Sequence, residues 1–124
     1  MMKHTSPFIG LFLLALLMAV GCEPEKEVGA ETAVMAPASS AGRADNDEGV
    51  GHYRQGHWDV AEGHFRKALK ADAKLAESHF NLALALDKMG KHDEATASFK
   101  KALELAPAKI AIKDSSILKK HLGM

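Results

Sequence analysis

Cysteine and histidine are the residue types in this sequence with the most distinctive chemistry. The chain has one cysteine, Cys22, which excludes a disulfide within the chain and a multi-cysteine metal site. His57 and His64 are seven residues apart, about two helical turns, and imidazole binds zinc, copper or nickel. However, His57 falls in a predicted turn and no His-Glu-x-x-His motif is present. We therefore expect no metal site, and a histidine-based metal or haem carrier is an alternative that these patterns do not favour.

Motifs typical of enzymes are missing from the sequence. It contains no phosphate-binding glycine loop, no paired-carboxylate motif and no recognisable Ser/His/Asp arrangement. The net charge is zero, and residues 49–124 have 13 Lys or Arg against 9 Asp or Glu. This surplus is too small to favour nucleic acid as a partner. We expect a protein that is not an enzyme, with neither catalytic residues nor a cofactor.

The first 21 residues have the pattern of a secretory signal peptide. After the positive charge of Lys3, residues 8–20 form an apolar run. As a helix this run would be about 20 Å long, short of the roughly 30 Å hydrocarbon core of a bilayer. A charged start, a short apolar core and small residues at its end are typical of a signal peptide rather than a spanning helix.

Cys22 stands directly after this segment. The sequence Ala19-Val20-Gly21-Cys22 resembles the bacterial lipobox. The resemblance implies cleavage between Gly21 and Cys22 and a lipid anchor on the Cys22 sulfur, where several acyl chains hold a protein firmly on a membrane. In the bacterial lipoproteins that this segment resembles, Asp at the next position favours retention in the inner membrane. Glu23 stands there instead, so the resemblance implies the periplasmic face of the outer membrane rather than the inner membrane.

Residues 22–43 are predicted to be a flexible acidic tether. They are dominated by Ala, Gly, Ser, Pro and Glu, without a sustained apolar period. Such a segment buries too little apolar surface to offset the entropy lost on ordering.

The remainder of the chain repeats itself with a constant offset of 34 residues. The matching pairs are Gly56 and Gly90, Asp59 and Asp93, Ala61 and Ala95, Phe65 and Phe99, and the triplets Lys67-Ala68-Leu69 and Lys101-Ala102-Leu103. A period of this length indicates stacked supersecondary units. Glycine suits the end of one helix, aspartate the start of the next, and alanine the close approach of neighbouring helices.

The period and these residue types resemble the tetratricopeptide repeat family. Residues 76–109 match its pattern at Leu82, Ala83, Gly90, Ala95, Phe99, Ala102 and Pro107, whereas residues 42–75 match in their second half and depart at Glu48, His52 and Ala73. The resemblance implies an all-α helical solenoid over residues 44–124, with two helix-turn-helix repeats. An amphipathic capping helix over residues 110–122 is expected to cover the exposed end.

A peptide groove is predicted on the concave face of this solenoid. Helix 76–89 is apolar around most of its circumference, which indicates burial on more than one side. The family resemblance implies a groove lined by Asn46, Val50, Tyr53, Arg54, Phe80, Leu84, Lys88 and Leu118. A mostly apolar groove with a cationic fringe suits a peptide or helix. The alternative is that Phe80 and Leu84 are covered by their own chain.

These features predict a membrane-anchored scaffold or assembly factor of the bacterial cell envelope, with an unidentified protein or peptide partner. The alternative is a self-associating structural envelope protein without a dedicated client. Two repeats plus a cap is the lower limit for such an array, and glycine in a helix interior costs about 1 kcal/mol relative to alanine. Association between copies would compensate for such a marginal domain.

Overall fold

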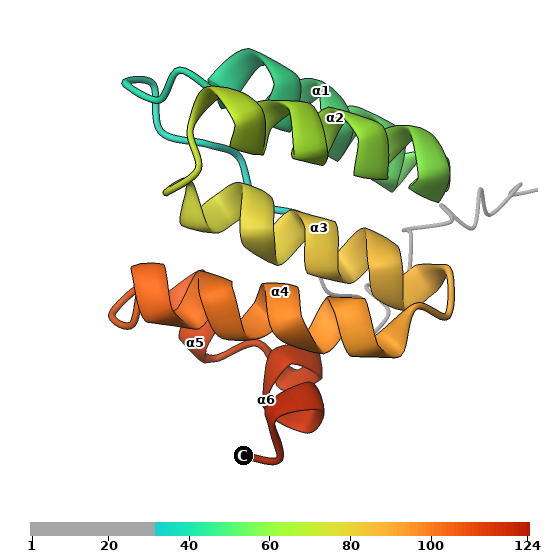
Figure 1. The fold of residues 1–124 in the computed structure, drawn as a ribbon, viewed down its shortest axis with the longest axis vertical. Helices are drawn as coiled ribbons and strands as arrows, with labels where there is room; N and C mark the ends of the chain where they lie inside the picture. Colours follow the sequence, from blue (N-terminus) through green and yellow to red (C-terminus); the bar gives the residue numbers. More distant parts are fainter. Residues whose placement is uncertain (1–31) are drawn as a thin grey trace, which may run out of the picture.

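The computed structural model describes residues 32–124, and the regular secondary structure in this part of the chain is entirely helical (Figure 1). Its helices are α1 (Arg43–Arg54), α2 (Trp58–Ala71), α3 (Ala76–Lys88), α4 (His92–Leu105), α5 (Ile110–Lys113) and α6 (Ser116–Leu122). None of the helices between residues 32 and 124 is long and apolar enough to cross a bilayer. The predicted signal peptide and the predicted lipidation residue Cys22 lie outside the described residues.

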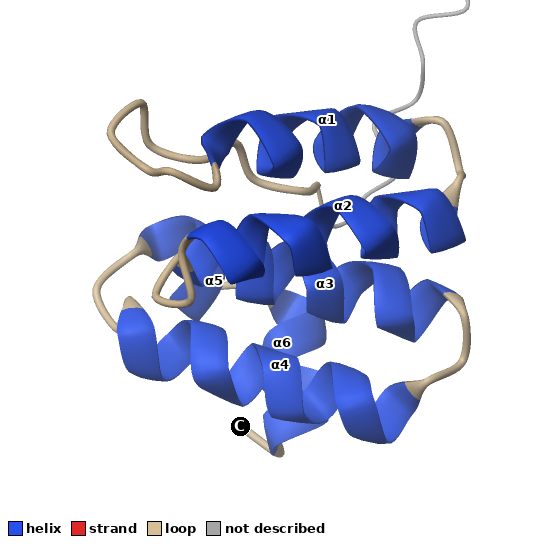
Figure 2. Ribbon diagram, turned by 45° about the horizontal axis from the view of Figure 1, so that its top comes forward, coloured by secondary structure: helices blue, strands red, loops and turns tan. Residues whose placement is uncertain are grey.

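The first four helices form two stacked hairpins. Helices α1 and α2 make one layer and α3 and α4 the next, with α5 and α6 against the far side of α4 (Figures 1 and 2). Helix α3 packs against α2, α4 and, at one side, α1. The predicted all-α solenoid of two helix-turn-helix repeats is confirmed.

The turns within the two hairpins depend on the repeated glycines. Gly56 has a φ of 81° and Gly90 a φ of 77°, a left-handed conformation that glycine adopts without steric cost. Asp59 and Asp93 lie in the first turns of α2 and α4, where a negative charge stabilises the helix dipole. The 34-residue repetition therefore marks equivalent places in the two hairpins.

The core lies between the helix layers, and several of its small and aromatic members are residues that repeat in the sequence. Phe65 and Phe99 have no exposed surface. Phe80 from α3 meets Phe99 edge-on, with ring centres 5.6 Å apart, an arrangement that aromatic rings favour. The four alanines that repeat in the sequence are likewise fully buried: Ala61, Ala68, Ala95 and Ala102.

Two predictions about the ends of the domain are wrong. Residues 32–42 are not flexible, because Ala33 is 3% exposed and the segment is hydrogen-bonded to α1 and α3. The capping helix is broken into α5 and α6 at Ser115, whose hydroxyl accepts a hydrogen bond from the Leu118 amide. This N-terminal cap begins a new helix. The apolar spacing of residues 110–122 does not reveal such a local hydrogen bond.

Candidate functional site

The predicted apolar groove is not an open surface. Six of its predicted residues are buried, with exposed fractions of 7% or less: Asn46, Val50, Tyr53, Phe80, Leu84 and Leu118. Phe80 belongs to the core against Phe99. The prediction of an open groove is therefore wrong, and the alternative in which Phe80 and Leu84 are covered by their own chain is confirmed. An array of two hairpins has so little interior that its short end segments are needed to cover the apolar face of α3.

The two predicted cationic residues remain accessible. Arg54 and Lys88 are both exposed. The Lys88 ammonium lies 5.6 Å from the centre of the Trp58 ring, within the range of a cation–π contact. This contact brings together the end of α3 and the start of α2, so the cationic fringe lies beside the first hairpin.

The feature that replaces the open groove is the segment before α1. Figure 1 shows this segment, in cyan, passing from the start of α1 towards α3. Asn81 of α3 accepts a hydrogen bond from the Val34 amide at 2.7 Å and donates one to the Val34 carbonyl at 2.7 Å. Asn46 of α1 donates to the same carbonyl at 3.0 Å. Two side-chain amides thus satisfy both backbone polar groups of one extended residue.

Further polar contacts hold this arrangement in place. Asn46 Oδ1 accepts hydrogen bonds from the Ser78 hydroxyl at 2.8 Å and from Asn81 at 2.9 Å. Asp47 accepts from the Ala36 amide at 2.9 Å. Burial raises the pKa of Asp47, but its hydrogen bonds from Ala36, Asn46 and Arg43 outweigh that effect and leave the pKa below its usual value. Because buried polar groups are costly unless paired, this fully connected set fixes the position of the segment.

Asn46 was a predicted groove residue and it does contact a peptide-like segment, whereas Asn81 and Ser78 were not predicted. A signal for Asn81 was present, since it is an amide within the apolar run of helix 76–89. A buried amide needs partners for its donors and acceptor. The sequence did not show that those partners would be backbone groups of residue 34.

Two clusters of histidine and carboxylate side chains are present among residues 32–124. One consists of Glu48, His52 and His64, and the other of Asp87, His92 and His121. In the second cluster, Asp87 Oδ1 lies 2.9 Å from His92 Nδ1 and 2.8 Å from His121 Nε2. The other nitrogen of His121 lies 2.7 Å from the Thr96 hydroxyl. This cluster is a closed hydrogen-bond network that attaches α6 to α3 and α4.

The Asp87 network is expected to make stability depend on pH. Burial raises the pKa of Asp87, but hydrogen bonds and charge from His121 and His92 outweigh it, so the pKa lies below the ordinary value of 3.8. A lowered carboxyl pKa stabilises the fold above the unfolded value, and this stabilisation is lost as the pH falls through the folded value. Asp87→Asn should therefore be about 1–3 kcal/mol less stable at neutral pH, with the deficit shrinking under acid. Urea denaturation at neutral and acidic pH measures the loss of stability and its decrease in acid. Asp114→Asn, at an exposed position, is the control.

The comparisons with known proteins identify part of the chain. Residues 76–109 match the family model described as the tetratricopeptide repeat. These residues, which comprise α3, α4 and the turn after them, are a tetratricopeptide repeat, and the α1–α2 hairpin has the same construction one period earlier. The comparison with curated proteins finds no match. Tetratricopeptide repeats generally mediate interactions between proteins.

Proposed function

We propose that this chain is a membrane-anchored interaction module of the bacterial cell envelope, which binds an extended peptide of a partner protein where residues 33–36 lie. The observation that supports the site is the pair Asn46 and Asn81, which together satisfy the amide and the carbonyl of Val34. Paired amides of this kind recognise extended backbone whatever its side chains. Hydrogen bonds to main chain supply affinity in such peptide recognition, and pockets for alternate side chains supply specificity.

The residues of the segment indicate which peptide would fit. Ala33 is 3% exposed, Val34 is partly buried and Met35 is 49% exposed. The site would therefore select a small residue at the buried Ala33 position and tolerate a large one at the exposed Met35 position. A partner peptide must displace residues 33–36, which compete as an intramolecular ligand.

The predicted lipid anchor would hold this site close to the bilayer. Cys22 precedes Ala33 by 11 residues, which span at most about 36–40 Å when fully extended. Only partners at the membrane surface would then be within reach. Cys22→Ser should remove lipid label from the chain and release it from the membrane fraction, whereas unchanged membrane association would refute the anchor.

The peptide site is tested by opening it. Ala33→Asp/Val34→Pro places a charge in a buried position and removes the amide that donates to Asn81. A fluorescent peptide with the sequence of residues 31–38, ETAVMAPA, should then bind the full-length chain in trans. Fluorescence anisotropy measures this binding.

Two control proteins make this experiment decisive. Thr32→Asp/Met35→Pro introduces the same residue types at neighbouring exposed positions and should leave the site closed, without peptide binding. Adding Asn81→Ala to the opened chain should abolish binding. Absence of binding by an opened chain that retains its helical spectrum would refute the site. Proteins captured from solubilised membranes by the opened chain, and lost with Asn81→Ala, would identify the partner.

A further inference from the structure

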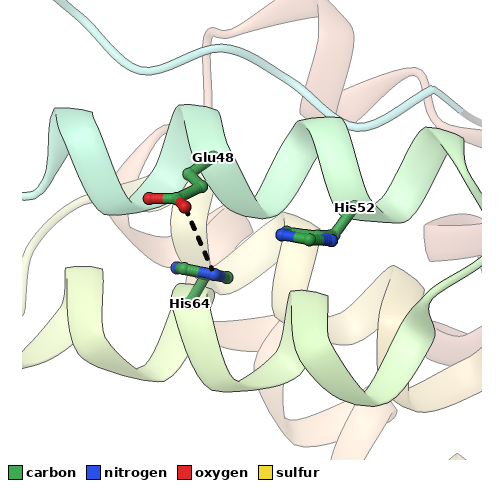
Figure 3. A group of neighbouring side chains, drawn as sticks. All are labelled: Glu48, His52 and His64. Atoms are coloured by element: carbon green, nitrogen blue, oxygen red, sulfur yellow. Dashed lines mark ion pairs between the residues drawn. The ribbon is translucent and has the colours of Figure 1, made fainter.

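The first hairpin gathers three side chains that can bind a metal. Glu48 and His52 are one helical turn apart on α1, and His64 faces them from α2. Figure 3 shows the three side chains between the two helices, with Glu48 and His64 joined across the gap. One ligand atom from each residue lies within 4.8 Å of the other two. Sequence spacing pointed to His57 and His64, but it could not place Glu48 and His52 beside them.

The distances within this cluster suit a shared ion better than direct hydrogen bonds. Glu48 Oε1 lies 3.9 Å from His64 Nε2, too far for a hydrogen bond. Two ligands that each lie about 2.0–2.1 Å from a zinc ion are separated by up to about 4.2 Å. The His52 and His64 rings stack nearly parallel, with centres 5.2 Å apart, so one imidazole has to turn for both histidines to face one ion.

The other nitrogen of His64 supports the same interpretation. His64 Nδ1 is buried without a hydrogen-bond partner within residues 32–124. It faces Asp45 Oδ1 at 3.9 Å, and Lys67 lies 3.0 Å from the same oxygen. Metal-binding histidines commonly direct their second nitrogen at a carboxylate, which orients the ring. Asp45 is positioned to do this for His64 while Nε2 faces Glu48.

A fourth ligand is close at hand in the turn before α2. His57 Nδ1 lies 3.5 Å from His52 Nδ1, a separation that fits two ligands of one tetrahedral ion. The second cluster differs, because both histidines there already bond the Asp87 carboxylate.

We propose that Glu48, His52 and His64 form a binding site for a divalent late transition metal, with His57 completing its coordination. Imidazole and carboxylate ligands on two helices suit Zn²⁺. The bound ion would link α1 to α2 and so stabilise the first hairpin. Residues 33–36 lie just before this hairpin in the chain. The site is independent of the proposed peptide site, since it shares no residue with it.

The test is zinc binding by the full-length chain, purified in detergent without a histidine tag. Calorimetric titration should show one equivalent of Zn²⁺ bound from micromolar solution, together with a rise in Tm of several degrees. His52→Gln/His64→Gln should weaken zinc binding by on the order of 100-fold or more, since even the partners that orient a ligand contribute 10–100-fold. His92→Gln/His121→Gln is the matched control and should bind zinc as the wild type does.

A measurement on the wild-type protein tests the proposal without depending on how the variants fold. In NMR spectra, zinc should shift the imidazole signals of His52 and His64 and leave those of His92 and His121 in place. No saturable binding from micromolar zinc, equal binding by the His52/His64 variant, or shifts confined to His92 and His121 would each overturn the proposal.

Discussion

Phe99→Ala is expected to reduce the free energy of unfolding by about 3–5 kcal/mol, the usual cost of truncating a buried phenylalanine. Phe99 has no exposed surface. Its ring touches Phe80 of α3 and lies 5.1 Å from the His121 ring of α6, measured between centres. Truncation would leave a cavity where α3, α4 and α6 meet, so the second hairpin and the end of the chain should loosen together. The total free energy of unfolding of a small domain is about 5–15 kcal/mol, so this loss is a large share of its stability.

Urea denaturation followed by circular dichroism measures this loss. The matched control is Val60→Ala, because Val60 is 42% exposed on α2 and its truncation should change stability by less than about 0.5 kcal/mol. Equal stability of Phe99→Ala and the wild type would contradict the packing of α3 on α4. A loss confined to α6, seen as hydrogen exchange of that helix alone, would show that Phe99 secures only the cap.

Substitution of the helical glycines by alanine is expected to have opposite effects at different positions. Gly49 is buried where α1 crosses α2, and a Cβ there would lie 2.6 Å from Phe65 Cε1. The Phe65 ring has no exposed surface and cannot move aside without disturbing the core. Gly49→Ala should therefore destabilise the domain by about 1–3 kcal/mol, the range for overpacked cores. At Gly51 and Gly63, by contrast, an added Cβ would meet no neighbouring atom within 4 Å.

Gly51→Ala and Gly63→Ala serve as controls for Gly49→Ala, and each should stabilise the domain by up to about 1 kcal/mol. All three changes add the same methyl group to a helix, so helix propensity alone predicts the same sign for all. Thermal unfolding of the three single variants measures the difference. Stabilisation by Gly49→Ala would contradict the close crossing of α1 and α2.

The helical repeat was predictable because it depends on residues with one strong structural role. Gly56 and Gly90 mark the two left-handed turns, and Phe65 and Phe99 occupy equivalent core positions. Each of these roles is local or is repeated one period later, so a single sequence reveals it.

The proposed peptide site was only partly predictable, because its contacts join residues far apart in the sequence and involve main-chain groups. Residues 33–36 have the small, weakly apolar composition of a flexible segment, and no periodicity marks Val34 as the partner of Asn81. Phe80 lies on the helix face that the family resemblance assigns to a groove, yet in so short an array it is needed in the core. Amino-acid composition gives only the average tendency of a segment to be flexible or buried. Whether residues 33–36 are buried depends instead on the apolar surface of α3 that remains uncovered after the two hairpins pack.

The hydrogen bonds between Val34 and Asn81 join residues 47 positions apart in the chain, and this separation orders the events of folding. Each helical hairpin closes through contacts between near neighbours in sequence, which form rapidly. Docking of residues 33–36 requires α3, so it follows the formation of the hairpins. During synthesis residues 33–36 leave the ribosome before Asn81 does, so they cannot yet form these hydrogen bonds. Throughout that interval the apolar face of α3 and the backbone of residues 33–36 are each without their final partner, so both sides of this contact stay exposed until α3 has formed.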